Sequence, residues 1–258
     1  MSFQLEVIAF NIESCVIAER SGANRIELCD NPHDGGTTPS LGMIQLAREK
    51  TTIQLFPIIR PRAGDFLYSE DEFSIMKRDI RACKEIGCDG VVFGILNPDG
   101  TVDARRTMKL VELAYPLEVT FHRAFDRVED PYDSLEIIIE AGCQRILTSG
   151  CKPTALEGAF TIQQLVKQAD ERIIVMPGSG VRSSNILDLI KETGAKEFHT
   201  SARISTQSNM EYQNPLMNEN LESISLDESE IKKILSLLKT EMISSQDADG
   251  AMAPRKDA

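Results

Sequence analysis

The chain has 258 residues, a formal net charge of −12 at pH 7 and 41% hydrophobic residues, enough apolar material for one large α/β domain. The acidic balance argues against nucleic acid or anionic lipid as partners, because both attract clustered Lys and Arg. The six cysteines include no CxxC pair, and no apolar run approaches the roughly 20 residues of a membrane-spanning helix. We therefore expect a cytoplasmic protein with reduced thiols and no membrane partner.

Short β-rich runs alternate with amphipathic helical patterns along the chain, at the spacing typical of βα units. The predicted strands are 3–10, 24–29, 53–59, 90–95, 117–122, 145–149, 172–176 and 197–201. The predicted helices are 12–21, 40–50, 70–87, 104–114, 131–141, 160–169, 184–193 and 227–242. Eight such units predict a single, closed (β/α)8 TIM barrel over residues 1–243.

Two segments fall outside this repeat. The connection between the last strand and the last helix, residues 204–226, is long and polar, and we expect it to form a loop or a short helix over the barrel mouth. Residues 244–258 are rich in small and charged residues and predict a flexible C-terminal tail.

The second predicted strand carries Glu27 and Cys29 two residues apart, so both side chains lie on one face. If that face is the barrel interior, Glu27 needs a partner, which Arg60 or Arg123 could supply. Glu27 is then either part of a structural ion pair or an acid or base. Cys29 could be a soft ligand for Cu(I), or a small residue that fills the barrel.

The third predicted strand is followed by Arg60, Arg62 and Asp65. Two guanidinium groups near one barrel mouth suit a carboxylate or a phosphate better than they suit a metal. Alternatively, these three side chains are ordinary loop charges exposed to solvent. We assign the three residues to an anion-binding site.

The fifth predicted strand ends in His122, Arg123 and Asp126, where an apolar run changes abruptly to charged side chains. The carboxyl ends of parallel strands build the sites of α/β barrels. His122 could act as an acid or base, a metal ligand or a hydrogen-bonded core residue, and Asp126 could orient it. We predict catalytic roles for His122, Asp126 and Glu27.

Small residues Gly178 and Gly180 follow the seventh predicted strand and precede a helix. Such a loop leaves backbone N–H groups free for phosphate, although a tight turn also requires glycine. Polar residues at the other strand ends complete the predicted anion-binding set: Arg123, Ser149, His199 and Ser201.

Six motifs occur in an order and spacing that resemble the CutC copper-homeostasis family. They are Arg25-Ile-Glu-Leu-Cys29, Gly35-Gly-Thr-Thr-Pro-Ser-Leu-Gly42, Ile58-Ile-Arg-Pro-Arg-Ala-Gly-Asp-Phe66, Val119-Thr-Phe-His-Arg-Ala-Phe-Asp126, Arg145-Ile-Leu-Thr-Ser-Gly150 and Gly178-Ser-Gly-Val181. The resemblance implies a cytoplasmic barrel protein that binds copper and forms a homo-oligomer, a dimer or a tetramer. In members proposed to bind copper, a second cysteine lies near the end of the first strand, where this chain has Ile8.

Two functions therefore stay open. The first is a role in copper homeostasis, with Cu(I) bound at Cys29. The second is a barrel enzyme acting on a small anionic metabolite, in which Arg60 and Arg62 hold the anion, His122 or Glu27 moves a proton and the glycine loop holds phosphate. No HExxH, Walker A, GxSxG or GxGxxG motif occurs to name a reaction.

Overall fold

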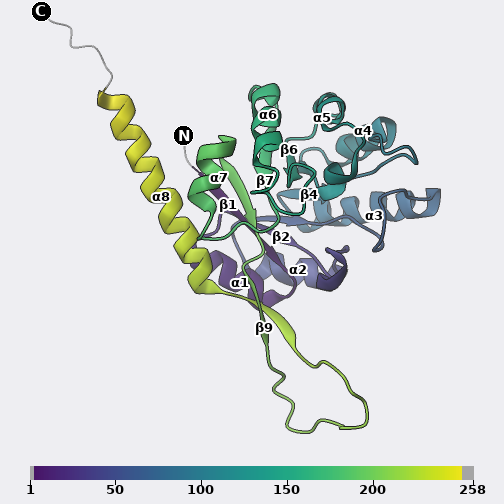
Figure 1. The fold of residues 1–258 in the computed structure, drawn as a ribbon. Coiled ribbons are helices and arrows are strands. Elements are labelled where there is room, and N and C mark those ends of the chain that lie inside the picture. The colour runs from purple at the N-terminus through teal and green to yellow at the C-terminus, as the bar shows by residue number, and fades with distance from the viewer. Residues whose placement is uncertain (1–2, 252–258) are drawn as a thin grey trace, which may run out of the picture.

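The computed structural model describes residues 3–251 and shows eight parallel strands, each followed by a helix (Figure 1). The strands are β1 Gln4–Ala9, β2 Arg25–Leu28, β3 Gln54–Pro57, β4 Gly90–Phe93, β5 Glu118–Phe121, β6 Arg145–Thr148, β7 Ile174–Pro177 and β8 Glu197–Thr200. The helices are α1 Ile12–Ser21, α2 Leu41–Lys50, α3 Glu70–Ile86, α4 Ala104–Ala114, α5 Pro131–Glu140, α6 Ala159–Ala169, α7 Ile186–Thr193 and α8 Glu228–Ala251. The predicted eightfold βα repeat is confirmed.

The strands form two four-stranded parallel sheets, in the orders β3-β2-β1-β8 and β4-β5-β6-β7. At the β3–β4 junction the Ile59 N–H donates to the Val92 carbonyl at 2.7 Å, whereas no strand pairing joins β7 to β8 within residues 3–251. The predicted (β/α)8 barrel fold is confirmed, but the ring of strand pairing is interrupted between β7 and β8 and is not completely closed as predicted. Pro57 and Pro177 end β3 and β7 at these two junctions, and proline has no N–H to add to a ladder.

The alternation of side chains along each strand creates two separate apolar regions. Outward residues of β1, such as Leu5 and Val7, join a large core between the sheets and the helices. A smaller cluster fills part of the barrel interior and consists of Phe10, Cys29, Phe56, Ile58 and Val92, with Ile8 packed against it. Charged side chains such as Glu6, Arg25 and Arg145 also lie in the interior.

The helix ends follow ordinary capping chemistry. Asn11 accepts a hydrogen bond from the Ser14 N–H at the start of α1, and Ser69 and Glu72 form a capping box at the start of α3. Gly22 ends α1 in the left-handed conformation, with φ of 95°. These turns fix where each helix leaves and rejoins the barrel.

The long connection after β8 differs from the prediction. It forms an antiparallel hairpin of β9 Arg203–Thr206 and β10 Ser223–Leu226, whose loop extends away from the barrel (Figure 1). The base of the hairpin contacts the barrel mouth, where Asn11 Nδ2 donates a hydrogen bond to the Ile224 carbonyl at 2.7 Å. The β-branched residues Ile204, Thr206 and Ile224 favour strand pairing over a helix.

The last helix also continues past the predicted start of the tail at residue 244. Helix α8 extends to Ala251, and the remaining predicted tail, 252–258, lies outside the described residues. Within residues 3–251, we find no helix with the length and apolar character needed to cross a membrane.

Candidate functional site in the barrel interior

An ion network occupies the amino-terminal end of the barrel. Arg25 and Arg145, the first residues of β2 and β6, both contact Glu197, at 2.8 and 2.9 Å. Both guanidinium groups also lie over the Phe56 ring, at 4.9 and 5.5 Å from its centroid. Because Arg25, Arg145 and Glu197 are buried and mutually paired, we interpret this layer as structural.

A second charged group lies one layer closer to the mouth and involves Glu6, Glu27 and His199. These residues face inward from the adjacent strands β1, β2 and β8, and Glu6 is directly opposite His199 in the strand register. His199 Nδ1 lies 2.8 Å from Glu6 Oε1, and His199 Nε2 lies 3.9 Å from Glu27 Oε2. One possible ligand atom from each residue lies within 4.8 Å of the other two, so the group could hold a metal ion.

Burial and mutual charge alter the acidities of this group. Burial disfavours the ionised form of Glu6, but the hydrogen bond with His199 and the charge of Arg25 outweigh it and lower the pKa of Glu6 to about 2. Burial and the neighbouring Glu6 charge raise the pKa of Glu27 to about 7, against the opposing effect of His199. Burial disfavours the charged imidazole, but the hydrogen bond with Glu6 raises the pKa of His199. Two ionised carboxylates would strain this interior without a proton or a cation between them.

Cys29 lies beside this group and inside the barrel. Burial and the negative charges of Glu27 and Glu6 raise the pKa of the Cys29 thiol well above its usual value, and the thiol hydrogen-bonds to Glu27. Gly36, at φ of 92°, covers the sulfur so closely that an added Cβ would lie 3.1 Å from Sγ. The predicted shared inward face of Glu27 and Cys29 is confirmed. The predicted arginine partner of Glu27 is not found, since His199 and Cys29 take that place.

His122 is buried at the end of β5 and does not contact Asp126 as predicted. Its Nδ1 accepts a hydrogen bond from the Ala124 N–H at 3.2 Å, and its ring packs 4.9 Å from that of Phe66. Burial and the charge of Arg60 lower the pKa of His122 to about 3, so the imidazole is neutral at pH 7. The proton is then on Nε2, which has no hydrogen-bond partner among the described residues.

Asp126 instead joins the ends of β5 and β6. Its carboxylate accepts from the Thr148 hydroxyl at 2.6 Å, from the Ser149 N–H at 2.9 Å and from the Cys151 N–H at 3.2 Å. It also pairs with Arg123 Nε at 2.7 Å, and Arg123 donates to the Ser149 hydroxyl at 2.8 Å. The predicted residues Arg123, Asp126 and Ser149 are therefore together, but Asp126 is a loop-organising acceptor rather than the partner of His122.

Arg60 holds loops together through backbone carbonyls. Its Nη atoms donate to the carbonyls of Asp34, Gly36 and Gly64, at 2.7, 2.7 and 2.8 Å. Its Nε has no partner among the described residues, although the side chain is buried.

Arg62 pairs with Glu72 at 2.5 Å and with Asp65 at 2.9 Å. It also donates to the Leu67 carbonyl at 2.7 Å. Because Arg62 and Asp65 neutralise each other and Arg60 holds carbonyls, the structure does not support the predicted two-arginine clamp.

The glycine loop after β7 is built for close packing. A Cβ at Gly178 would lie 2.5 Å from Leu147 Cδ1, and Gly180 has a φ of 80°. The N–H and hydroxyl of Ser183, just before α7, are held by the Glu230 carboxylate at 2.7 and 2.8 Å. The Gly178 N–H donates to the Thr148 carbonyl at 2.9 Å, so neither this N–H nor that of Ser183 is free for the predicted phosphate. Ser201, half-buried, follows β8.

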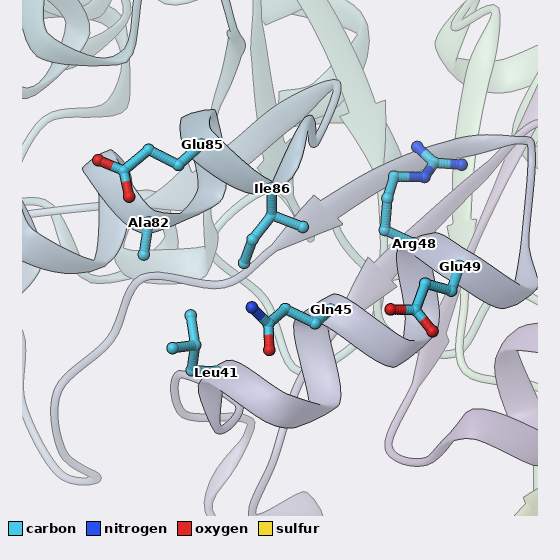
Figure 2. A pocket seen from close by; sticks show the side chains of 7 residues that line it. All are labelled: Leu41, Gln45, Arg48, Glu49, Ala82, Glu85 and Ile86. Carbon is cyan, nitrogen blue, oxygen red and sulfur yellow. The ribbon is translucent and has the colours of Figure 1, made fainter.

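Surface hollows are shallow and lie apart from the interior group. Figure 2 shows one of about 370 Å³ between α2 and α3, where Arg48 and Glu49 lie across from Glu85. Arg48 forms an ion pair with Asp89 at 2.7 Å, so its positive charge is already neutralised. A second hollow, of about 400 Å³, lies at the mouth and is lined in part by Asp65, Phe66 and Arg127.

Four interior residues were not among those predicted from the sequence: Glu6, Arg25, Arg145 and Glu197. A signal was available for Glu6, which interrupts an apolar strand at an inward position shared with Ile8. A charged residue inside a buried strand needs partners and so marks polar interior chemistry.

Comparison with known proteins agrees with the motifs. A family model described as the CutC family matches residues 3–204. The mouse copper homeostasis protein cutC homolog is 50% identical over 82% of this chain and 78% of its own length. A CutC family protein of Parabacteroides distasonis is 54% identical over 81% of this chain and 87% of its own. A crystal structure of a copper homeostasis protein CutC from Streptococcus agalactiae matches with a TM-score of 0.74 and 33% identity, over 77% of this chain and 98% of that one. The chain therefore belongs to the CutC family.

Proposed function

We propose that this protein acts in copper homeostasis and contacts Cu(I) through Cys29. The biological role is supported by the names of the relatives at about 50% identity. We further propose a cytoplasmic homo-oligomer, a dimer or a tetramer, which light scattering of the purified protein would test.

The observation that carries the copper contact is the position of Cys29. It belongs to the barrel-interior cluster, whereas Cys15, Cys83, Cys88 and Cys143 lie in the core between the sheets and the helices. A thiolate is the soft ligand that Cu(I) prefers, and Cu(I) must displace a proton from this high-pKa thiol. With Ile8 where a second cysteine would stand, the site has one sulfur and we expect weak binding.

Anaerobic titration with Cu(I) in competition with a chelator tests this contact. We expect the wild type to take up one Cu(I) per chain only against a chelator of low affinity, and we expect this uptake to be lost in Cys29→Ser. Cys143→Ser is the matched control, because Cys143 is also a single buried cysteine but lies in the outer core, and it should bind as the wild type does. Equal uptake by the Cys29 variant removes the proposed contact.

A barrel enzyme or binding protein for a small anion is the second candidate, and two buried donors favour it. His122 Nε2 and Arg60 Nε have no hydrogen-bond partner within residues 3–251, and both side chains lie near the Phe66 ring at the mouth. Buried donors without partners cost roughly 1–3 kcal/mol each, and a carboxylate or phosphate oxygen would supply the acceptor.

Thermal shift against inorganic phosphate and a panel of small carboxylic acids tests this candidate. At least one anion should raise the melting temperature, less so at high salt, and the effect should be lost in His122→Asn. Arg62→Met is the control, since Arg62 is occupied by Glu72 and Asp65. A wild type that responds to none of these anions contradicts the second candidate.

A further inference from the structure

The contact between His199 and Glu27 is too long for a hydrogen bond, so the two side chains face each other without bonding directly. His199 Nε2 and Glu27 Oε2 are 3.9 Å apart, beyond the roughly 3.2 Å limit of an N–H···O bond. Two ligands that each lie about 2.0–2.2 Å from one ion at a tetrahedral angle are roughly 3.3–3.6 Å apart, so a shift of a few tenths of an ångström would let one ion bind both atoms.

The other side of the imidazole is fixed in the way that metal-binding histidines usually are. His199 Nδ1 is hydrogen-bonded to Glu6 Oε1 at 2.8 Å. When Nδ1 carries the proton, Nε2 presents its lone pair towards Glu27. A carboxylate behind a histidine in this way orients the ring and increases its basicity as a ligand.

Glu27 supplies a second, independent observation. Its side chain is nine-tenths or more buried, yet among the described residues it receives no backbone N–H, and its one hydrogen bond comes from the Cys29 thiol. A buried carboxylate normally collects several N–H or O–H donors. The open side of Glu27 faces His199.

We infer that Glu27 and His199 Nε2 bind one divalent transition cation inside the barrel, with Glu6 orienting His199 through Nδ1. Carboxylate and imidazole ligands suit Mn²⁺, Fe²⁺ and Zn²⁺, whereas Cu(I) prefers sulfur. Water or an oxygen of a bound molecule would fill the remaining positions. This site goes beyond the proposed copper contact, because it uses other residues and another class of ion.

The direct test is binding of Mn²⁺, followed by electron paramagnetic resonance of the free ion. We expect one Mn²⁺ per chain in the wild type and at least a tenfold loss of affinity in Glu27→Gln, a variant that keeps the side-chain shape. Glu118→Gln is the matched control, because Glu118 pairs with Arg145 outside this group. No Mn²⁺ binding in the wild type, or unchanged binding in Glu27→Gln, overturns the inference.

Two further measurements separate this site from a folding defect and from the copper contact. Pulsed electron paramagnetic resonance of Mn²⁺ bound to the wild type should show coupling to one imidazole nitrogen. This coupling should be retained in His33→Gln. Its absence in the wild type overturns the inference without any need for a Glu27 variant. Co²⁺ should bind without a thiolate charge-transfer band and equally well in Cys29→Ser. A thiolate band lost in that variant would move the cation to Cys29 and overturn the inference, while leaving the copper proposal intact.

Discussion

His199 and Glu6 are 193 residues apart in sequence, yet His199 Nδ1 lies 2.8 Å from Glu6 Oε1 inside the barrel. The contact follows from the parallel pairing of β1 with β8, the first and last strands of the repeat. It brings the two ends of the barrel chain into one buried polar group, so stability and ligand chemistry depend on the same residues.

The ion network beneath this group should be sensitive to loss of its arginine. Arg25→Met keeps the bulk but leaves Glu6 and Glu197 short of positive charge, and we expect a loss of roughly 3–5 kcal/mol in the free energy of unfolding. Urea denaturation measures it. Arg172→Met, which breaks the exposed pair with Glu136, should leave the unfolding midpoint nearly unchanged. Similar small effects in both variants would show that the buried network contributes little.

His122 should make the protein less stable in acid. The pKa of His122 is about 3 in the folded state, against an ordinary value of 6.5. Below pH 6.5 the unfolded chain therefore binds a proton on this imidazole, whereas the folded chain does not. The free energy of unfolding should then fall by up to about 1.4 kcal/mol per pH unit as the pH drops towards 3. In His122→Asn this part of the slope should vanish. Parallel stability curves for the two proteins between pH 6 and about 4 would contradict the neutral, buried assignment.

Close packing inside the barrel should make one glycine intolerant of a methyl group. A Cβ at Gly90 would lie 2.4 Å from the Phe56 ring and 2.7 Å from the Glu118 carbonyl oxygen. Gly90→Ala should therefore cost roughly 1–3 kcal/mol in unfolding free energy, measured by urea denaturation. Gly42→Ala in α2, where an added Cβ has no neighbour within 4 Å, should be neutral or slightly stabilising. A neutral Gly90→Ala would mean that the Phe56 ring and the β5 backbone can move away to accommodate a methyl group.

A second sulfur should strengthen the proposed copper contact. Ile8 packs against the interior cluster that contains Cys29, so Ile8→Cys brings two soft donors to the same part of the barrel. Chelator competition should show at least a tenfold higher affinity for Cu(I) than in the wild type. Val7→Cys, on the outward face of β1, is the matched control and should have no such effect. Equal affinities in all three proteins would argue against copper in the interior.

The local pattern of the sequence was sufficient for the eight βα units, because alternation, glycine stops and capping residues are encoded within each unit. It also placed Glu27 and Cys29 on one inward face. The local sequence pattern was not sufficient to predict which groups these side chains bond to. The sequence suggests that Asp126 could orient His122, but the backbone N–H groups of the loop after β6 bind its carboxylate instead.

Contacts between residues far apart in the sequence could not be predicted either, because they depend on how the loops fold. Whether Arg60 meets Glu27 or the carbonyls of Asp34, Gly36 and Gly64 depends on how two loops fold over the mouth. The hairpin after β8 was missed because its pairing strands are separated by a long polar loop, which weakens any local signal.

Copper-edge X-ray absorption of the protein loaded with Cu(I) reports the atoms bound to the metal and so shows whether Cys29 binds copper. We expect a sulfur neighbour of copper in the wild type and in Cys143→Ser, lost in Cys29→Ser. A copper environment of nitrogen and oxygen alone in the wild type, or a sulfur signal that persists without Cys29, would contradict it.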